Sequence, residues 1–482
     1  MQTPPVLVWF RQDLRIADQP ALHAAAATGR PALCVYVLDD ETPGRWPMGG
    51  ASRWWLHGSL GALARDLQGL GGRLVLRRGR SADVIAEMAR ASGATAVYWN
   101  RHVEPFWRTA EADLERRLAA FGIAIHTFSG QTLFAPGTIR GARGQTLRVF
   151  TPFWRACLAA MPPPQPLPAP TALCPVADAP AGDALADWRL LPGTPDWAGG
   201  LREQWQPGAA AAAERLSAFL DGGVAGYHGS RDRPEPGGTS RLSPHLHFGE
   251  ISARQVWLGA MLQAGAQPRL AGDVDAFVRE VGWREFCANV LTEAPHLPDR
   301  PLQAKFDRFP WADDDAAFRA WSRGRTGYPI VDAGMRQLWA TGWMHNRVRM
   351  IVGSFLVKDL LIPWQRGEAW FWDTLVDADL ANNAGGWQWI AGCGVDAAPY
   401  FRIFNPVAQG ERFDADGAYV RKWLPVLRRL PDRWVHRPWE APPLELAGAG
   451  VRIGVDYPAP IVDHRQARDR ALAAFAAIKG AE

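Results

Sequence analysis

Short apolar runs alternate with amphipathic stretches through the first third of the chain. The apolar runs, rich in β-branched residues, predict strands over residues 6–10, 31–38, 73–77, 95–99 and 122–128. The amphipathic stretches predict helices over residues 52–69, 82–91 and 107–120. This alternation is typical of an α/β domain with a doubly wound parallel sheet. No GxGxxG motif follows the first predicted strand, so a conventional dinucleotide site is not expected there.

The pattern changes in a segment rich in Pro, Ala and Gly, residues 160–205, which is either wrapped on the surface or loose. The sequence beyond it is almost wholly helical in pattern, with helices predicted over residues 209–221, 251–264, 273–292, 330–361, 368–380 and 464–478. We therefore predict an α/β domain over residues 1–132, an interdomain linker over 133–205 and an all-α domain over 206–482.

Composition adds a compartment and excludes a membrane span. A chain of 482 residues that is 48% hydrophobic can bury two cores. It contains no uninterrupted run of about 18 apolar residues, so we expect no membrane span. The N-terminus lacks the basic region and cleavage site of a signal peptide. The five cysteines show no CxxC or Cys/His ligand spacing, so we expect a reduced cytoplasm and no metal site.

Charge and aromatic content leave the partner open. The net charge of +4 neither demands nor excludes nucleic acid, although the basic residues are almost all Arg, which suits bidentate phosphate contacts. Biased genomic composition, which the abundant Ala also indicates, is the favoured explanation for the scarcity of Lys. Most of the 24 Trp must be core, but so many indoles also supply material for electron transfer and base stacking.

Three segments of the helical part carry polar groups that need partners. The hydroxyls of Gly238–Ser243, at a predicted helix start after Ala225–Asp232, are suited to a phosphate, although Ser and Thr cap most helices. In the next helix Glu280, Trp283, Arg284 and Cys287 share one face, where Glu280 and Arg284 would otherwise form a surface ion pair.

The third segment runs from Thr341 to Trp389. Asn346 and Met350 share one side of a predicted helix, where Asn346 would otherwise bond a backbone group. Downstream, Asp377 and Asp379 need cationic or hydrogen-bonding partners, and we expect Arg349 to pair with Asp377.

Together these segments resemble the cryptochrome/photolyase family over residues 5–475, most closely over 326–410, which includes Ala397–Pro406. The resemblance implies an α/β antenna domain and an all-α domain that binds FAD. It implies repair of cyclobutane pyrimidine dimers in DNA, in which light-excited reduced FAD gives an electron to a flipped-out dimer and regains it after the ring splits. The single His345 in its segment matches dimer repair rather than repair of (6-4) photoproducts.

The resemblance also assigns residues to roles. The lesion site would comprise Glu280, Trp283, Asn346, Met350 and Trp389. The FAD site would comprise Tyr227, Thr239, Ser240, Arg241, Leu242, Ser243, Phe277, Arg349, Asp377, Ala378, Asp379 and Asn383. Contacts to DNA would come from Arg231, Glu280, Trp283, Arg284, Cys287, Asn346, Arg347, Trp389 and Arg402. Electrons would reach the flavin through Trp311, Trp364 and Trp387.

Two further positions separate repair from signalling. Asn383 aligns with the residue that faces flavin N5, where plant cryptochromes carry an acid and animal ones a thiol; Ala384 departs from the second Asn of many relatives. The segment that carries Trp387 and Trp389 is a separate feature. If that segment is extended, the two indoles point to opposite sides of it. We expect a monomer that acts on UV-damaged DNA at the nucleoid.

Two alternatives have other functions. A cryptochrome photoreceptor signals through a tail or partner surface, but the chain ends soon after a predicted helix and Asn383 favours repair. An adenylyl transferase with a helical lid needs a phosphate motif in the first domain, and none is visible. The antenna chromophore, methenyltetrahydrofolate or a deazaflavin, stays undecided. In folate-binding bacterial members an Asn-Glu pair stands where this chain has Phe106 and Trp107, which leaves only a different folate geometry between aromatics.

Overall fold

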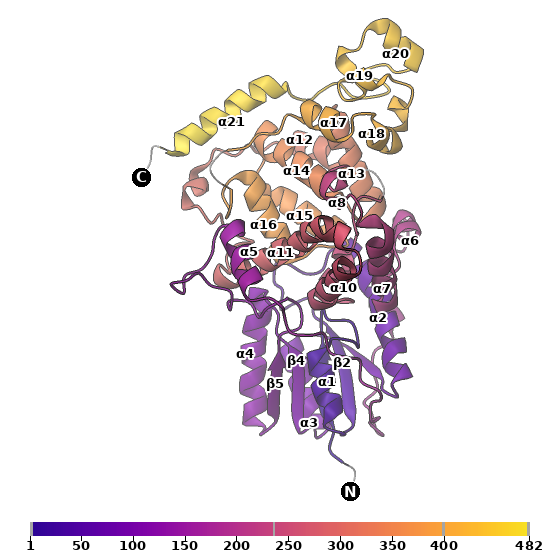
Figure 1. The fold of residues 1–482 in the computed structure, drawn as a ribbon, viewed down its shortest axis with the longest axis vertical. Coiled ribbons are helices and arrows are strands. Elements are labelled where there is room, and N and C mark those ends of the chain that lie inside the picture. The colour runs from indigo at the N-terminus through magenta and orange to yellow at the C-terminus, as the bar shows by residue number, and fades with distance from the viewer. Residues whose placement is uncertain (1–2, 235–236, 398–400, 480–482) are drawn as a thin grey trace.

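The computed structural model describes residues 3–234, 237–397 and 401–479, and shows a sheet domain below a helical domain (Figure 1). Five parallel strands lie in the order β3-β2-β1-β4-β5. Their bounds are Val6–Phe10 (β1), Ala32–Leu38 (β2), Leu74–Arg78 (β3), Ala96–Asn100 (β4) and Ala124–Phe128 (β5). The predicted doubly wound sheet is confirmed, with each strand within two residues of its expected bounds.

Helices cover both faces of this sheet. Val6, Val8 and Phe10 share a core with α1 (Pro20–Ala27) and α2 (Gly50–Gly69), whereas Leu7 and Trp9 pack with α3 (Ser81–Ala91) and α4 (Pro105–Ala120). Burial on both faces explains the continuous apolar runs. The sequence did not predict α1, because its four consecutive Ala carry no periodicity; the Gln19 side chain caps it instead, accepting from Leu22 N at 3.1 Å.

The Pro-rich segment is wrapped on the sheet domain rather than loose. Its Leu167 carbonyl accepts from Asp18 N at 2.7 Å, and its Cys174 carbonyl accepts from Ala32 N at 3.0 Å. The segment between the domains also contains α5 (Phe150–Ala159), a 3-10 turn (Leu185–Trp188) and α6 (Gly199–Gln204). The helix α5, which the sequence did not predict, lies directly against α11.

The remainder of the described chain is helical, as predicted. Its α-helices are α7 (Ala209–Ala218), α8 (Tyr227–Ser230), α9 (Ser243–His247), α10 (Ala253–Ala266), α11 (Ala271–Glu293), α12 (Asp315–Ser322), α13 (Pro329–Thr341), α14 (Asn346–Ser354), α15 (Trp364–Thr374), α16 (Leu380–Ala391), α17 (Pro406–Phe413), α18 (Ala418–Trp423), α19 (Asp432–Val435), α20 (Pro443–Ala449) and α21 (His464–Lys479). Single π-helical turns follow α7 at Phe219–Gly223 and α14 at Phe355–Asp359. Short 3-10 turns span Pro268–Leu270, Ala304–Arg308, Pro425–Leu427 and Pro438–Glu440.

Two of the predicted helices are each broken near the candidate site. The helix expected over residues 330–361 ends where Gly342 adopts φ +64°, and α14 starts again behind His345, whose Nδ1 accepts from Arg347 N at 3.1 Å. The helix expected over 368–380 ends at Thr374, and α16 begins after Asp379. Both breaks place polar residues at helix N-termini instead of in helix interiors.

The segment that carries Trp387 and Trp389 is therefore helical, and the premise of an extended segment was wrong. Two residues on a helix differ by about 200°, so the two indoles still point in nearly opposite directions. Trp387 packs in one helical core, whereas Ala381 and Ala384 of the same helix pack in another. The helix α16 thus lies between the two cores of the helical domain.

Glu285 of α11 joins the helical domain to the start of the interdomain linker, and its burial predicts a pH dependence of stability. Its carboxylate accepts from Leu133 N at 2.9 Å, and burial raises its pKa to about 7. The native state therefore retains a proton that the unfolded chain loses above pH 4.5, so the free energy of unfolding falls as pH rises from about 4.5 to 7, by up to ~3 kcal/mol.

We expect Glu285→Gln, which keeps an acceptor for Leu133 N, to flatten this dependence. Thermal unfolding midpoints of both proteins at pH 5, 6, 7 and 8 measure it, with Glu87→Gln on the exposed side of α3 as control. A difference between Glu285→Gln and the parent that is the same at every pH would contradict the assignment.

Candidate functional site

Aromatic residues form the floor of the candidate cofactor site. The rings of Phe219, Tyr227 and Phe277 contact each other, with centroids 4.7 to 5.8 Å apart. They come from the π-turn after α7, from α8 and from α11, so one cluster fixes three elements relative to each other. Tyr227 is buried, and burial raises the pKa of its hydroxyl. The sequence prediction included Tyr227 and Phe277 but not Phe219.

The loop Thr239–Ser243 has a constrained conformation, and its Leu242 packs in the same core as the three rings. Arg241 adopts φ +53°, a left-handed conformation that is costly for a residue with a side chain and that occurs often at ligand clamps. Ser243 begins α9, and its Oγ accepts from Trp343 Nε1 at 3.2 Å. The hydroxyl loop is thereby tied to the segment between α13 and α14.

Two guanidinium groups near this loop lack an anion. Arg241 lies over the rings of Trp205 and Trp343, 4.6 and 4.9 Å from their centroids, and Arg215 lies 5.2 Å from that of Trp205. Burial and the neighbouring Arg215 lower the pKa of Arg241 to about 10. Within the described residues neither guanidinium forms an ion pair, and the buried Nε of each has no hydrogen-bond partner. A pyrophosphate, as in FAD, fits this arrangement.

The expected pairing of Arg349 with Asp377 is confirmed. Arg349 Nη2 donates to both carboxylate oxygens of Asp377, at 3.0 and 2.8 Å, and its Nε donates to Met344 O at 2.7 Å. Asp379 caps α16 by accepting from Asn382 N at 2.8 Å. These contacts hold the start of α16 against the start of α14, so the two predicted segments meet in space.

A second unsatisfied group lies next to Asn383. The Asn383 amide donates to the backbone carbonyl of Glu368 at 3.0 Å. Glu368 itself is fully buried, and in the part of the chain that the structure describes neither of its carboxyl oxygens has a hydrogen-bond partner. Burial raises the pKa of the Glu368 carboxyl well above its ordinary value, which favours the neutral form. The Asn383 side chain carries both a donor and an acceptor, which suits the polar edge of a ring such as isoalloxazine.

Two ion pairs gather the predicted lesion-facing residues. Glu280 of α11 pairs with Arg231, and the adjacent Asp232 pairs with Arg347 of α14 at 2.7 Å. Next to Arg347, Asn346 lies with its amide 3.9 Å from Met350 Sδ. The alternative of a Glu280–Arg284 ion pair is wrong.

Two residues predicted to contact DNA are engaged inside the protein. Arg284 donates to the backbone carbonyls of Gln131 and Leu246, at 2.8 and 3.3 Å. Cys287 lies against α16, where a Cβ on Gly385 would come within 3.1 Å of its sulfur. We therefore leave Arg284 and Cys287 out of the proposed DNA surface.

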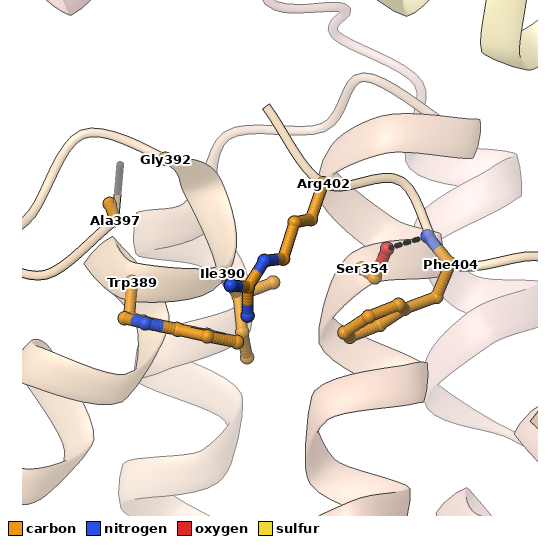
Figure 2. A pocket seen from close by; sticks show the side chains of 7 residues that line it. All are labelled: Ser354, Trp389, Ile390, Gly392, Ala397, Arg402 and Phe404. Carbon is orange, nitrogen blue, oxygen red and sulfur yellow. Dashed lines mark hydrogen bonds between the residues drawn. The ribbon is translucent and has the colours of Figure 1, made fainter. Parts of the chain in front are cut away.

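The two lesion-facing indoles have different supports. Trp283 is stacked on Phe150 of α5, with centroids 3.7 Å and ring planes 7° apart, a partner that the sequence missed because Phe150 falls in the predicted linker. Figure 2 shows Trp389 beneath Arg402, whose guanidinium carbon is 5.3 Å from the indole centroid, in a pocket that also includes Ser354 and Phe404. Residues 398–400 of the predicted 397–406 motif lie outside the described residues.

The predicted electron-transfer indoles lie in one core of the helical domain or pack against it. Trp387 is 2% exposed and packs so tightly on α15 that a Cβ on Gly367 would come within 2.1 Å of it. Trp364 precedes Gly367 by three residues and therefore shares its side of α15. Trp311 is partly exposed and packs on Phe309, with centroids 4.3 Å apart. Trp387 and Trp364 are both buried, and Trp311 is the one of the three indoles that is partly exposed.

A further cavity lies where the two domains meet, and it includes Phe106 and Trp107, which the sequence analysis considered for the antenna chromophore. Its walls include Arg11 after β1, Asp39 after β2, and Glu104, Phe106 and Trp107 after β4. Ligands in open α/β sheets bind at the carboxyl ends of strands where the strand order reverses, which here is between β1 and β4.

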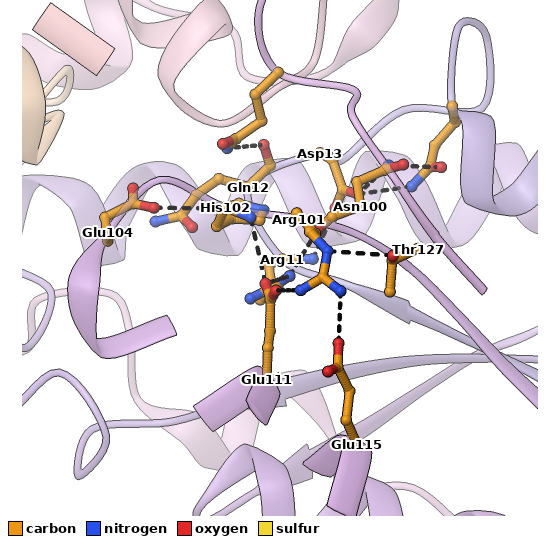
Figure 3. Close-up of polar contacts among 12 residues, drawn as sticks. Arg11, Gln12, Asp13, Asn100, Arg101, His102, Glu104, Glu111, Glu115 and Thr127 are labelled. Carbon is orange, nitrogen blue, oxygen red and sulfur yellow. Dashed lines mark hydrogen bonds and ion pairs between the residues drawn. The ribbon is translucent and has the colours of Figure 1, made fainter. Parts of the chain in front are cut away.

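A buried polar network shapes this edge (Figure 3). Arg11 donates to Asn100 O at 2.6 Å and to Glu111 Oε1 at 2.7 Å, and Asn100 donates to Asp13 Oδ2 at 2.7 Å. Nearby, His102 is buried at the domain junction, and burial with Arg11 lowers its pKa to about 3, so its ring is neutral. The network fixes the loops after β1 and β4, whose positions define the cavity.

Comparison with known proteins agrees with the geometry. Residues 6–171 match the DNA photolyase family model, and residues 277–477 match that for the FAD binding domain of DNA photolyase. The chain is 48% identical to a deoxyribodipyrimidine photo-lyase of Agrobacterium fabrum, with 99% of both chains covered. It is 39% identical to cryptochrome-1 of Arabidopsis thaliana, over 96% of this chain and 69% of that one.

Solved structures extend the likeness to three dimensions. A bacterial class III photolyase from Agrobacterium tumefaciens superposes with a TM-score of 0.95 at 47% identity, covering 99% of this chain and 98% of that one. A cryptochrome from Synechocystis superposes with a TM-score of 0.90 at 30% identity, covering 98% and 99%. An α/β domain joined to an FAD-binding helical domain defines the class as a two-domain flavoprotein. The chain belongs to the cryptochrome/photolyase family, as its sequence predicted.

Proposed function

We propose that this protein is a light-dependent deoxyribodipyrimidine photo-lyase that repairs cyclobutane pyrimidine dimers in DNA. The observation that carries the proposal is the pair of ion pairs Glu280–Arg231 and Asp232–Arg347, which gathers the lesion-facing residues around the start of α14. When bound in its reduced form, FAD supplies under near-UV or blue light the electron that splits the dimer.

The protein's own residues bind and orient the two partners. Glu280 and Asn346 hydrogen-bond the polar edges of the flipped-out dimer, while Trp283 and Trp389 stack against its rings. Burial raises the pKa of the Glu280 carboxyl against the opposing influence of Arg231, which favours a protonated, donating carboxyl when the ion pair opens to a lesion. Arg349, Asp377, Asp379 and Asn383 bind and orient the flavin.

The proposed DNA surface is basic and only partly self-neutralised. Arg231 and Arg347 already pair with carboxylates, so a phosphate must share them, whereas Arg402 contacts Trp389 by its guanidinium face. Contacts of this kind give affinity that depends on salt and hardly on sequence. We propose that the protein acts as a monomer on UV-damaged DNA of the nucleoid; within the described residues no helix is long and apolar enough to cross a bilayer.

We propose that the α/β domain ends at residue 132 and that the helical domain begins at residue 206, as the sequence predicted.

We further propose that the cavity between the domains holds the antenna chromophore. Phe106 and Trp107 stand in the cavity wall, which suits a flat pigment held between aromatics. Absorption and fluorescence spectra of the purified protein distinguish methenyltetrahydrofolate from a deazaflavin. If the protein is incubated with each of the two pigments in turn and its spectrum afterwards shows FAD alone, the assignment of this cavity is contradicted.

Trp283→Ala should weaken binding to dimer-containing DNA selectively. Loss of one stacking contact costs about 1–3 kcal/mol, or ~5- to 150-fold in Kd, while phosphate contacts to undamaged DNA stay intact. Fluorescence anisotropy on matched damaged and undamaged duplexes measures both constants, with Trp283→Phe as the control that retains a stacking ring. Equal weakening on both duplexes would place Trp283 outside the lesion site.

A further inference from the structure

The indole of Trp283 has a fixed partner on one of its faces. The Phe150 ring of α5 lies 3.7 Å from it, centroid to centroid, with the two planes 7° apart. Phe286, one turn further along α11, meets the Phe150 and Trp283 rings edge-on, at interplanar angles of 80° and 79°. Phe150 is buried, whereas Trp283 is half-buried. A base that stacks on Trp283 must therefore use the face away from Phe150.

The helix α5, which carries Phe150, is packed closely against α11 (Figure 1). A Cβ on Gly282 of α11 would come within 2.5 Å of the Trp154 ring, so glycine permits this approach. The Trp154 ring is parallel to that of Phe150, with planes 7° apart. Because Phe150 is the first residue of α5, its position depends on how the helix begins.

The start of α5 is capped by a residue from a distant part of the chain. Its own N-cap residue, Val149, provides no side-chain acceptor. Instead the Asp396 carboxylate accepts from Phe150 N at 3.4 Å. The N–H groups of a first helical turn have no partner within the helix, and a carboxylate there also interacts favourably with the helix dipole. Asp396 thus fixes the turn of α5 that presents Phe150 to Trp283.

The same residue contacts the second lesion-facing indole. The backbone carbonyl of Asp396 accepts from Trp389 Nε1 at 3.1 Å. Asp396 adopts φ +53°, a left-handed conformation that is uncommon for a residue with a side chain and that is found often at functional sites. The turn before it is anchored on α16, because Cys393 N and Gly394 N both donate to Gln388 O at 3.0 Å. Asp396 therefore supports one indole through its side chain and the other through its backbone.

We propose that Asp396 and Phe150 are positioning residues of the lesion site, which fix Trp283 and Trp389 relative to each other before DNA binds. The inference rests on the proposed function, because it takes these two indoles as the walls that receive the flipped-out dimer. Indoles that are already held lose less side-chain freedom when the dimer enters, which strengthens lesion binding without a new contact. Undamaged DNA places no flipped-out base between them, so its affinity should not depend on this arrangement.

The first experiment removes the ring beneath Trp283 in the full-length, FAD-loaded protein. Phe150→Leu keeps an apolar side chain but no flat surface. We expect the Kd for a dimer-containing duplex to rise about 2- to 12-fold and that for an undamaged duplex to stay unchanged. Phe153→Leu is the matched control, because Phe153 is equally buried on the same helix and contacts Phe286 at 5.3 Å. In the Trp283→Ala background, Phe150→Leu should cause no further loss, since its effect passes through Trp283.

The second experiment separates the side chain of Asp396 from its backbone. Asp396→Gly keeps the left-handed conformation and removes the cap of α5, so we expect the same selective loss as in Phe150→Leu. Asp396→Val disfavours that conformation and moves the carbonyl away from Trp389, so we expect a larger selective loss. Asp396→Asn retains an acceptor and tolerates the left-handed region, so it should restore most of the affinity that Asp396→Gly loses. Asp314→Gly, which removes the cap of α12, is the control for the loss of a helix cap.

A measurement without DNA reports on the indoles themselves. Hydroxyl-radical footprinting, read by peptide mass spectrometry, measures how fast each Trp side chain reacts with radicals in the solvent. We expect Trp283 to react faster than in the parent protein in both Phe150→Leu and Asp396→Gly. Trp389 should react faster in Asp396→Val, while both control variants stay at the parental level.

Three results would overturn the proposal. They are parental Trp283 reactivity in Phe150→Leu, an equal loss of affinity for damaged and undamaged duplexes, and a further loss from Phe150→Leu in the Trp283→Ala background. Failure of the proposed function looks different. A parent protein that binds both duplexes equally and shows no light-dependent repair in its reduced form rejects the photo-lyase assignment, while the footprint still decides whether Asp396 and Phe150 hold the two indoles.

Discussion

Trp387→Phe is expected to lose photoreduction of oxidised FAD, by at least about tenfold in rate, yet to repair dimers when the flavin is reduced chemically beforehand. Trp387 is the flavin-proximal indole of the predicted route through Trp364 and Trp311, so its replacement interrupts that route at its start. Phenylalanine nearly keeps the apolar volume against Gly367 and Phe371 but removes the more easily oxidised indole, so the fold should survive.

Absorbance at 450 nm under blue light, with dithiothreitol present, measures the rate in parent and variant at equal FAD occupancy. Trp188→Phe, in the segment packed on the sheet domain, controls for the loss of any buried indole. Photoreduction at the parental rate in Trp387→Phe would show that other Trp residues carry the electron.

Arg349→Met is expected to release FAD and to destabilise the helical domain by ~3–5 kcal/mol, because it leaves the buried Asp377 carboxylate without its partner. The hydrogen bond from Arg349 to Met344 O, which positions the start of α14, is lost at the same time. Thermal unfolding and FAD retention after gel filtration measure the two effects.

The double variant Arg349→Met with Asp377→Asn provides the control. Removing both charges leaves no unpaired buried ion, so part of the lost stability should return, and the double-mutant cycle isolates the pair energy. If Arg349→Met alone is as stable as the parent and retains FAD, the ion pair does not join α14 to α16 as the account requires.

The sheet domain could be predicted from sequence because its signal is local. A strand that is buried on both faces appears in the sequence as a short continuous apolar run, such as Val6–Phe10. The predicted strand bounds were right within two residues. The helical domain was predicted only coarsely. Periodicity alone did not reveal that Gly342 ends α13 or that Asp379 begins α16, since both depend on backbone conformation and capping.

The contacts of the candidate site also fall into those that the sequence could predict and those that it could not. Arg349 and Asp377 could be paired from sequence, because two acids and a guanidinium in one apolar context leave few alternatives. Glu280 was harder, since Arg284 one turn away was the nearest cation, yet the fold brings Arg231 to it instead. Phe150 under Trp283 had no local signal, whereas Phe106 and Trp107 were considered from sequence without any indication of the cavity that they line.

Light-dependent repair is the most direct test of the central claim. Protein with demonstrated, chemically reduced FAD is incubated with an oligonucleotide that contains one cyclobutane thymine dimer, in blue light and in darkness, and the products are separated by liquid chromatography. The account predicts that unmodified thymines return in light and not in darkness. No light-dependent repair from protein with bound, reduced FAD would contradict it and favour a cryptochrome-type photoreceptor.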